Sequence, residues 1–273
     1  MDAQQAERAE IEALASVTLN APVGIARDLG LHLVSDHGTV MALATSADVL
    51  ALNRIVGLGA EIPATREQLV RLIRTARERG TKRLFVQIIP GHTPATLGDW
   101  IEAEGGRKYN RWVRLWRDLQ TLPDVKTDLQ IRRIDTEHAL RSGEIVAEAF
   151  DMPKDLAPWI ASTVGRPGWI HAGAFDGSDL VGSAALYVSR KVAWLGFAAT
   201  LESHRGHGAQ GALIRRRMEL ARELDCESIV VETAEQTPDH SAPSYRNMIR
   251  FGFTEAYFRQ NYLIDLRTGN SAG

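Results

Sequence analysis

Cysteine is almost absent from this sequence, since Cys226 is the only one in 273 residues. Without a second thiol no internal disulfide can form, so a disulfide-stapled fold is excluded and a reducing compartment is favoured. No apolar run reaches the length of a membrane span, and residues 1–12 are polar and acidic, unlike a signal peptide. We therefore expect a cytoplasmic protein without a membrane partner.

An excess of either charge is lacking as well. The chain carries 32 lysines and arginines against 34 aspartates and glutamates, a formal net charge of −2. Because positive and negative charges nearly cancel, the chain has no excess of positive charge that would attract a polyanion, so we expect no nucleic-acid partner. Hydrophobic residues make up 44% of the chain, which is enough to build the cores of one large or two ordinary domains.

Hydrophobic periodicity predicts helices and strands that alternate along the chain. Helices are expected at 5–19, 65–80, 96–104, 137–150 and 156–164, and strands at 31–35, 40–45, 53–58, 84–89, 109–116, 129–134, 169–175, 180–188, 192–200 and 229–233. This order predicts an α/β (α+β mixed) fold with a mixed, mostly antiparallel sheet and helices on both faces.

The two halves of the chain repeat one another. Ala-Arg-Glu stands at 76–78 and again at 221–223, the matching strands begin at 84 and 229, and a glycine follows at 106 and 252. The nearly constant offset favours a tandem duplication, with a chance similarity of two α/β units as the alternative. A linker-like composition at 121–128 predicts domains at 1–125 and 126–273.

The most informative stretch is 200–214, which follows a predicted strand and opens a helix. Its Gly206, Gly208 and Gly211 permit tight turning and close approach of the backbone to a ligand. The first amide N–H groups of a helix have no intrahelical partner and favour an anion, and Arg205 adds a guanidinium suited to phosphate. From the residues alone, this unit predicts an anion site or a purely structural turn.

Residues 205–210 resemble the R-x-x-G-x-G/A signature of the GCN5-related N-acetyltransferases, except that Gln210 stands where Gly or Ala is usual. Residues 229–233 and 250–253 are similar to the fifth strand and the terminal Gly-Phe turn of that family. The resemblance implies acetyl-CoA as co-substrate, with its pyrophosphate at the turn and its pantetheine arm along the preceding strand. The cofactor-binding residues it implies are Ala198, Ala199, Thr200, Arg205, Gly206, His207, Gly208, Ala209, Gln210, Gly211 and Asn247.

Two catalytic residues are expected. Amide formation needs a base that takes a proton from the ammonium group, and Glu232 is the candidate. An equally weighted alternative is that Glu232 forms a fixed ion pair with Arg217, because Arg217 lies in the apolar stripe of its helix and needs a partner there. The family often places a tyrosine four residues before the final Gly-Phe to protonate the departing thiolate. Met248 occupies that position, so Tyr245 is the expected acid, with a packing role as the alternative.

The resemblance predicts an N-acetyltransferase that moves an acetyl group from acetyl-CoA to a primary amine by direct attack. The alternatives are a non-catalytic acyl-CoA-binding or regulatory module and a structural protein with an empty cleft. The first half is expected to be degenerate, because Glu61 opposes phosphate and Pro63 removes an N–H donor at the corresponding turn, 57–63.

The acceptor is less well defined by the sequence. Glu148, Asp151 and Asp155 lie on segments expected to wall the acceptor side, which weakly favours a cationic amine on a small molecule or peptide. No metal is expected, since no cysteine or carboxylate cluster surrounds His204 and His207. The oligomeric state stays open, with a homodimer as one option.

Overall fold

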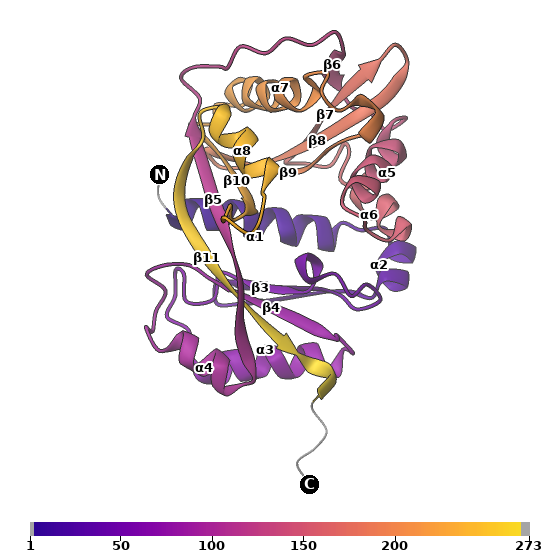
Figure 1. The fold of residues 1–273 in the computed structure, drawn as a ribbon. Coiled ribbons are helices and arrows are strands. Elements are labelled where there is room, and N and C mark those ends of the chain that lie inside the picture. Colours follow the sequence, from indigo (N-terminus) through magenta and orange to yellow (C-terminus); the bar gives the residue numbers. More distant parts are fainter. Residues whose placement is uncertain (1–2, 269–273) are drawn as a thin grey trace.

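The computed structural model describes residues 3–268 of the chain (Figure 1). Its first half contains α1 (Ala3–Leu19), α2 (Val23–Leu29), β1 (Leu31–Asp36), β2 (Thr39–Ala44), β3 (Arg54–Val56), α3 (Arg66–Glu78), β4 (Arg83–Ile88), α4 (Leu97–Ala103) and β5 (Gly106–Asp118). Helix α2 is one of the elements for which periodicity predicted no range, because seven residues are too few to display a helical repeat.

The second half follows the predicted order of two helices, three consecutive strands and a strand–helix repeat. Its elements are β6 (Gln130–Arg133), α5 (Ala139–Ala149), α6 (Ala157–Ala161), β7 (Trp169–Asp176), β8 (Asp179–Ser189), β9 (Val192–Thr200), α7 (Ala209–Glu223), β10 (Ser228–Ala234), α8 (Pro243–Arg250) and β11 (Thr254–Asp265). No helix of the described residues is long and apolar enough to cross a membrane.

Within residues 3–268, eleven strands form one sheet in the order β1-β2-β3-β4-β11-β5-β10-β9-β8-β7-β6. The pairs β3–β4 and β9–β10 are parallel and the other pairs are antiparallel. The predicted fold class, a mixed and mostly antiparallel sheet with helices, is therefore confirmed.

The tandem arrangement is confirmed in the order of elements, since α3-β4-α4-β5 in the first half corresponds to α7-β10-α8-β11 in the second. The final strands of the two halves are exchanged: β5 pairs with β10 of the second half, and β11 pairs with β4 of the first. In Figure 1 these two long strands run side by side through the centre of the molecule. The halves thus share one sheet, and the segment around the predicted 125/126 boundary is the loop between β5 and β6.

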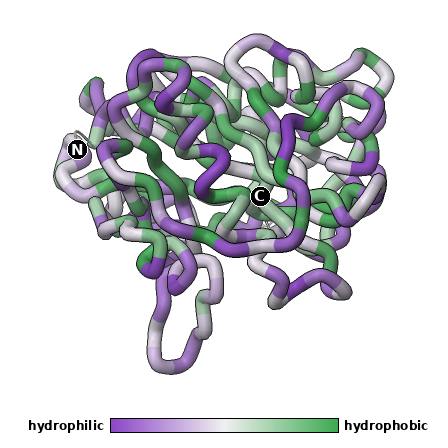
Figure 2. Tube along the Cα trace, turned by 90° about the horizontal axis from the view of Figure 1, so that it is seen from above, coloured by the Kyte–Doolittle hydropathy of each residue, from purple (hydrophilic) through white to green (hydrophobic). Residues whose placement is uncertain are grey.

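Helix α1 belongs to the first half in sequence and packs on both halves. Leu14 lies in a cluster with Val40 and Val56 of the first half. Ala6 and Ala9 are fully buried against Val192 and Val230, and further along the helix Val17 packs in a cluster with aromatic residues of β7 and α6. Alanines on this face allow the helix axis to approach the sheet closely. Figure 1 shows α1 between the two halves, and in Figure 2 hydrophobic segments run through the middle of the molecule while many outer segments are hydrophilic.

Candidate functional site

The turn between β9 and α7 is built on two glycines in the left-handed region. Gly206 has φ 86° and Gly208 has φ 78°, values that strain any residue with a Cβ. A Cβ at Gly208 would also lie 2.3 Å from the carbonyl oxygen of Lys126. Gly208 is the N-cap of α7, and no side chain caps this 15-residue helix. Its first amide groups and the positive end of its dipole therefore face the space beyond the turn.

A cleft of about 720 Å³ lies over this turn, walled by β9, α7 and α8. All but one of the residues implied for acetyl-CoA line it, namely Ala198, Ala199, Thr200, Arg205, Gly206, Gly208, Ala209, Gln210, Gly211 and Asn247. The exception is His207, whose backbone carbonyl accepts a hydrogen bond from Thr127 Oγ1 at 2.7 Å. The side chain of Arg205 is 58% exposed and its pair with Glu202 spans 3.9 Å, so its guanidinium can turn toward a phosphate.

Gln210, the departure from the signature, connects two walls of this cleft. The side chain of Asn247 on α8 donates to Gln210 Oε1 on α7 at 2.5 Å. Gly211 allows the ring of Phe251 to pack against α7, because a Cβ at this position would lie 2.5 Å from that ring. The amide pair and the glycine together fix α8 against α7 at the edge of the cleft.

Strands β9 and β10 separate next to the cleft. Their parallel pairing runs from Val192 to Leu195 on β9 and stops there. The β8–β9 register shifts opposite Ser183–Ala185, and Phe197 adopts φ 47°, so β9 bulges just beyond the last paired residue. A second cleft of about 390 Å³ lies at this separation. It shares Ala198, Gln210, Arg217 and Ser244 with the first cleft, so the two spaces are continuous.

Glu232 lines the second cleft from β10, but the partner predicted for it is wrong. Its carboxylate lies 2.5 Å from Arg259 Nη1, 3.5 Å from Arg54 Nη1 and 3.6 Å from Arg114 Nη2. Arg259 comes from β11, whereas Arg54 and Arg114 come from the first half. Helical periodicity could not reveal these partners, because each reaches Glu232 from a different strand of the shared sheet.

Helix α1 completes the ionic cluster around Glu232. Glu7 lies 2.6 Å and Glu10 lies 2.5 Å from Arg259 Nη2. Burial is the largest influence on the pKa of Glu232 and raises it; Arg259 lowers it, Glu10 raises it, and the net shift is upward. An upward shift makes Glu232 a better proton acceptor than an ordinary glutamate.

Arg217 is buried in the apolar stripe of α7, as predicted, but it has no carboxylate partner among the residues that the structure describes. Its Nε donates to the carbonyl of Leu213 at 3.2 Å, and its Nη1 donates to the carbonyl of Ala185 at 3.1 Å. Its Nη2 is buried and makes no hydrogen bond within this part of the chain. Burial lowers the pKa of Arg217 to about 9. The guanidinium lines both clefts, which places a positive charge where they join.

Tyr245 is not brought to either cleft, contrary to its predicted role as the acid. Its hydroxyl donates to Glu255 Oε1 at 2.7 Å, and this hydrogen bond raises the pKa of Tyr245. The cleft-facing side of α8 carries Ser244, Asn247 and Met248 instead. Ser244, which lines both clefts, is a residue that sequence reasoning missed, although it precedes Met248 by one helical turn and so shares its face.

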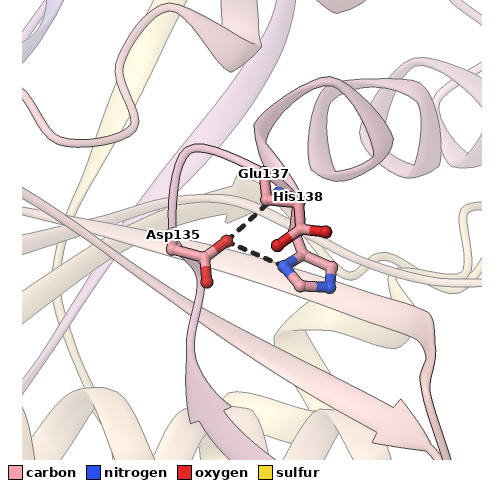
Figure 3. A group of neighbouring side chains, drawn as sticks. All are labelled: Asp135, Glu137 and His138. Carbon is pink, nitrogen blue, oxygen red and sulfur yellow. Dashed lines mark hydrogen bonds and ion pairs between the residues drawn. The ribbon is translucent and has the colours of Figure 1, made fainter.

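Asp135, Glu137 and His138 gather their side chains just before α5 (Figure 3). Asp135 Oδ1 accepts from the backbone N–H of His138 at 3.2 Å and contacts His138 Nδ1 at 2.8 Å. These are local hydrogen bonds within the turn that precedes α5, whose N-cap, His138, has no side-chain cap. The side chains of Asp135 and Glu137 are exposed, and none of the three lines the clefts described above. The contact between Asp135 and His138 is therefore a feature of this turn.

Comparisons with known proteins agree with this geometry. Residues 135–253 match the model of the acetyltransferase (GNAT) family. Among solved structures, a GCN5-related N-acetyltransferase from Kribbella flavida has TM-score 0.64 and 17% identity, with 95% of each chain covered. A tandem GNAT protein from the clavulanic acid biosynthesis pathway, solved without AcCoA, has TM-score 0.60 and 18% identity, with 96% of this chain and 95% of that chain covered.

A third structure, a GCN5-related N-acetyltransferase from Sphaerobacter thermophilus, has TM-score 0.60 and 15% identity, with 89% of this chain and 85% of that chain covered. At such identities these likenesses concern the fold, including its tandem form. No curated protein matches the sequence.

Proposed function

We propose that this chain is an acetyltransferase of the GNAT superfamily, because residues 135–253 match the model of that family and the fold is similar to that of a tandem GNAT protein. In this proposal it transfers an acetyl group from acetyl-CoA to a primary amine by direct attack. The observation that carries this proposal is the continuity of the two clefts. One begins at an anion-binding turn, and the other lies where β9 and β10 separate beside a buried carboxylate.

The residues of the first cleft suit the parts of acetyl-CoA in order. The free amides of α7 and the guanidinium of Arg205 bind the pyrophosphate. The small side chains of Ala198 and Ala199 let the pantetheine arm lie along β9, which leads the thioester to the bulge at Phe197 and to the separation of the strands. Holding both reactants there supplies most of the rate enhancement.

At the separation, the amine nitrogen forms a bond to the acetyl carbon while the carbon–sulfur bond breaks. Glu232 accepts the proton that the amine loses, because its raised pKa favours the protonated form after transfer. Arg217 stabilises the negative charge that gathers on the carbonyl oxygen and then on the departing sulfur. The thiolate finally takes a proton from water, so a tyrosine on α8 is not required.

In this proposal the first half has no anion site, because groups at its corresponding turn form hydrogen bonds within the chain. Gly59 accepts from Thr93 N at 2.9 Å, and Ala64 N donates to the carbonyl of Thr93 at 2.8 Å. The side chain of Thr65 accepts from the N–H of Gln68 at the start of α3. The N–H groups of Ala64, Gln68 and Thr93 are thus bonded within the chain and do not face a phosphate, so we expect one acetyl-CoA per chain.

Titration calorimetry with acetyl-CoA tests the binding part of the proposal. Wild-type protein should show a stoichiometry near one, and Arg205→Glu should abolish the heat. Arg216→Glu is the matched control, since Arg216 lies on α7 but pairs with Glu219 and Glu223 at 3.0 and 3.1 Å and lines neither cleft. Two equivalent sites, or binding that survives Arg205→Glu, would place the cofactor elsewhere.

Release of free CoA thiol with a panel of primary amines tests the transfer. Amine-dependent release supports the enzyme. Tight binding of acetyl-CoA without release from any amine would instead support the alternative, a non-catalytic acyl-CoA-binding or regulatory module, which the position of Tyr245 outside the clefts favours.

A further inference from the structure

A third cavity, of about 250 Å³, opens from the second cleft on the side covered by α1. It shares Trp112, Phe150, Phe197 and Glu232 with that cleft, so it begins where the proposed reaction takes place. Its aromatic lining comes from both halves of the chain and consists of Trp112, Phe150, Trp159, Trp169, Trp194 and Phe197.

Three of these rings form a cage. Trp169 stacks on Phe197 with ring centroids 5.8 Å apart, and Trp194 meets both of them edge-on with centroids 6.2 Å away. The indole N–H of Trp169 donates to Ser16 Oγ at 3.0 Å. The indole N–H of Trp194 is buried and has no partner among the described residues. Trp169 and Phe197 cover one face of each other, so the cage offers the remaining ring surfaces and one unused hydrogen-bond donor.

Charged groups occur only at one part of the cavity wall within the described residues. Glu10, Arg54 and Glu232 line it there, and behind the cavity wall Arg114 and Arg259 also pair with the two carboxylates. Glu10 Oε1 lies 3.0 Å from Arg54 Nη1 but makes no hydrogen bond within the part of the chain described. A cation that enters the cavity would thus meet carboxylate oxygen at this end and ring faces around it.

We propose that the acceptor is a primary amine carried by an aromatic body, with the ring held in the cage and the amino group directed at Glu232. This inference rests on the proposed transfer reaction and adds the class of acceptor. A cavity of about 150 Å³ holds a benzene molecule, so 250 Å³ accommodates a ring with a short alkyl chain. Aromatic walls recognise such a ring by stacking and by exclusion of water.

The acidic residues considered from the sequence lie elsewhere. Glu148 and Asp151 line a cavity of about 680 Å³ between α5 and α6 and do not line the aromatic one, although Met152 borders both. A polyamine would leave most of the ring faces without a matching apolar surface. Since the acidic lining residues Glu10 and Glu232 lie at one end of the cavity, a second ammonium group of a polyamine would be desolvated without a carboxylate beside it, which disfavours polycations.

The experiment compares kcat/KM for 2-phenylethylamine, 3-phenylpropylamine, putrescine and spermidine, measured by release of CoA thiol. We expect the aromatic amines to exceed the aliphatic ones by at least tenfold, in line with the discrimination of apolar pockets. Equal or higher kcat/KM for putrescine or spermidine would overturn the acceptor class and leave the transfer reaction standing. Failure of every amine, with acetyl-CoA still bound, would overturn both.

Two substitutions test whether the aromatic amine binds in the cage. Trp194→Leu should raise KM for 2-phenylethylamine at least tenfold while KM for acetyl-CoA changes little. Trp100→Leu is the control, because Trp100 packs against the core of the first half and lines none of the three cavities. Quenching of wild-type tryptophan fluorescence by 2-phenylethylamine reports occupancy without turnover. Absence of quenching, or equal effects of the two substitutions, would contradict the cage.

Discussion

Replacement of Arg217 by methionine is expected to stabilise the protein at neutral pH. Burial lowers the pKa of Arg217 to about 9 from an ordinary value of about 12.5, which corresponds to roughly 5 kcal/mol against the charged form at pH 7. Methionine removes that cost and keeps much of the apolar volume. It also loses the hydrogen bonds to Leu213 and Ala185, worth about 0.5–1.5 kcal/mol each. The net expected gain is roughly 2–4 kcal/mol.

The pH dependence of this stability difference shows whether the charge of Arg217 causes it. The folded pKa of Arg217 lies below the unfolded one, so the unfolded chain binds more protons between the two values, and stability rises with pH over that window. At pH 10.5 the penalty falls to roughly 3 kcal/mol. The advantage of methionine should therefore shrink by about 2 kcal/mol between pH 7 and pH 10.5.

Urea denaturation of wild type and Arg217→Met at both pH values measures this difference, and groups common to the two proteins cancel. Arg216→Met is the control: Arg216 pairs with Glu219 and Glu223, so its loss should cost about 0–1 kcal/mol. The reasoning is refuted if Arg217→Met is less stable than wild type, or if the gap does not change with pH. A more stable variant with reduced kcat would show that the charge is kept for catalysis.

The remaining predictions concern the proposed base Glu232, Tyr245 and the turn. Glu232→Gln should lower kcat by about 10²–10⁴-fold and remove the acidic limb of the kcat/KM profile; since the pKa of Glu232 is raised, that limb should lie above pH ~4.3 in wild type, with activity lost as pH falls through it. Tyr245→Phe should leave kcat within about twofold of wild type, because its hydroxyl bonds Glu255 outside the clefts; a drop of 10²-fold would restore it as the acid. Gly208→Ala should lower the melting temperature more than Gly206→Ala, because both glycines have positive φ but only a Cβ at Gly208 meets backbone, at 2.3 Å; equal shifts would contradict this.

The anion turn could be predicted from the sequence because its features are local. Glycines with positive φ, a helix start and Arg205 are all within a few residues of one another, and the structure places them on one cleft. The burial of Arg217 could be predicted for the same reason, since the period of a helix determines which side faces the sheet.

The partners of Glu232 could not be predicted, because they lie on strands distant in sequence. The residues that contact Glu232 are 178, 118 and 27 positions away, at Arg54, Arg114 and Arg259. They meet only because β5 and β11 exchange places in the sheet. The orientation of Tyr245 was missed for a related reason: the pattern of α8 does not show which polar side faces the cleft and which faces Glu255.

The exchange of β5 and β11 also lets the first half contribute residues to the site in the second half. Glu10 of α1, Arg54 of β3 and Trp112 of β5 all line the aromatic cavity, and Arg54 lies 3.5 Å from the carboxylate of the proposed base, Glu232. Without these residues the cavity would lose a wall and the pKa of Glu232 would change with its surroundings. In the proposed enzyme, the first half of the chain therefore does not bind acetyl-CoA. It forms the acceptor side of the site in the second half. This accounts for one shared sheet rather than two separable domains, because the acceptor wall can be held rigidly only if it is continuous with the strands that carry the base.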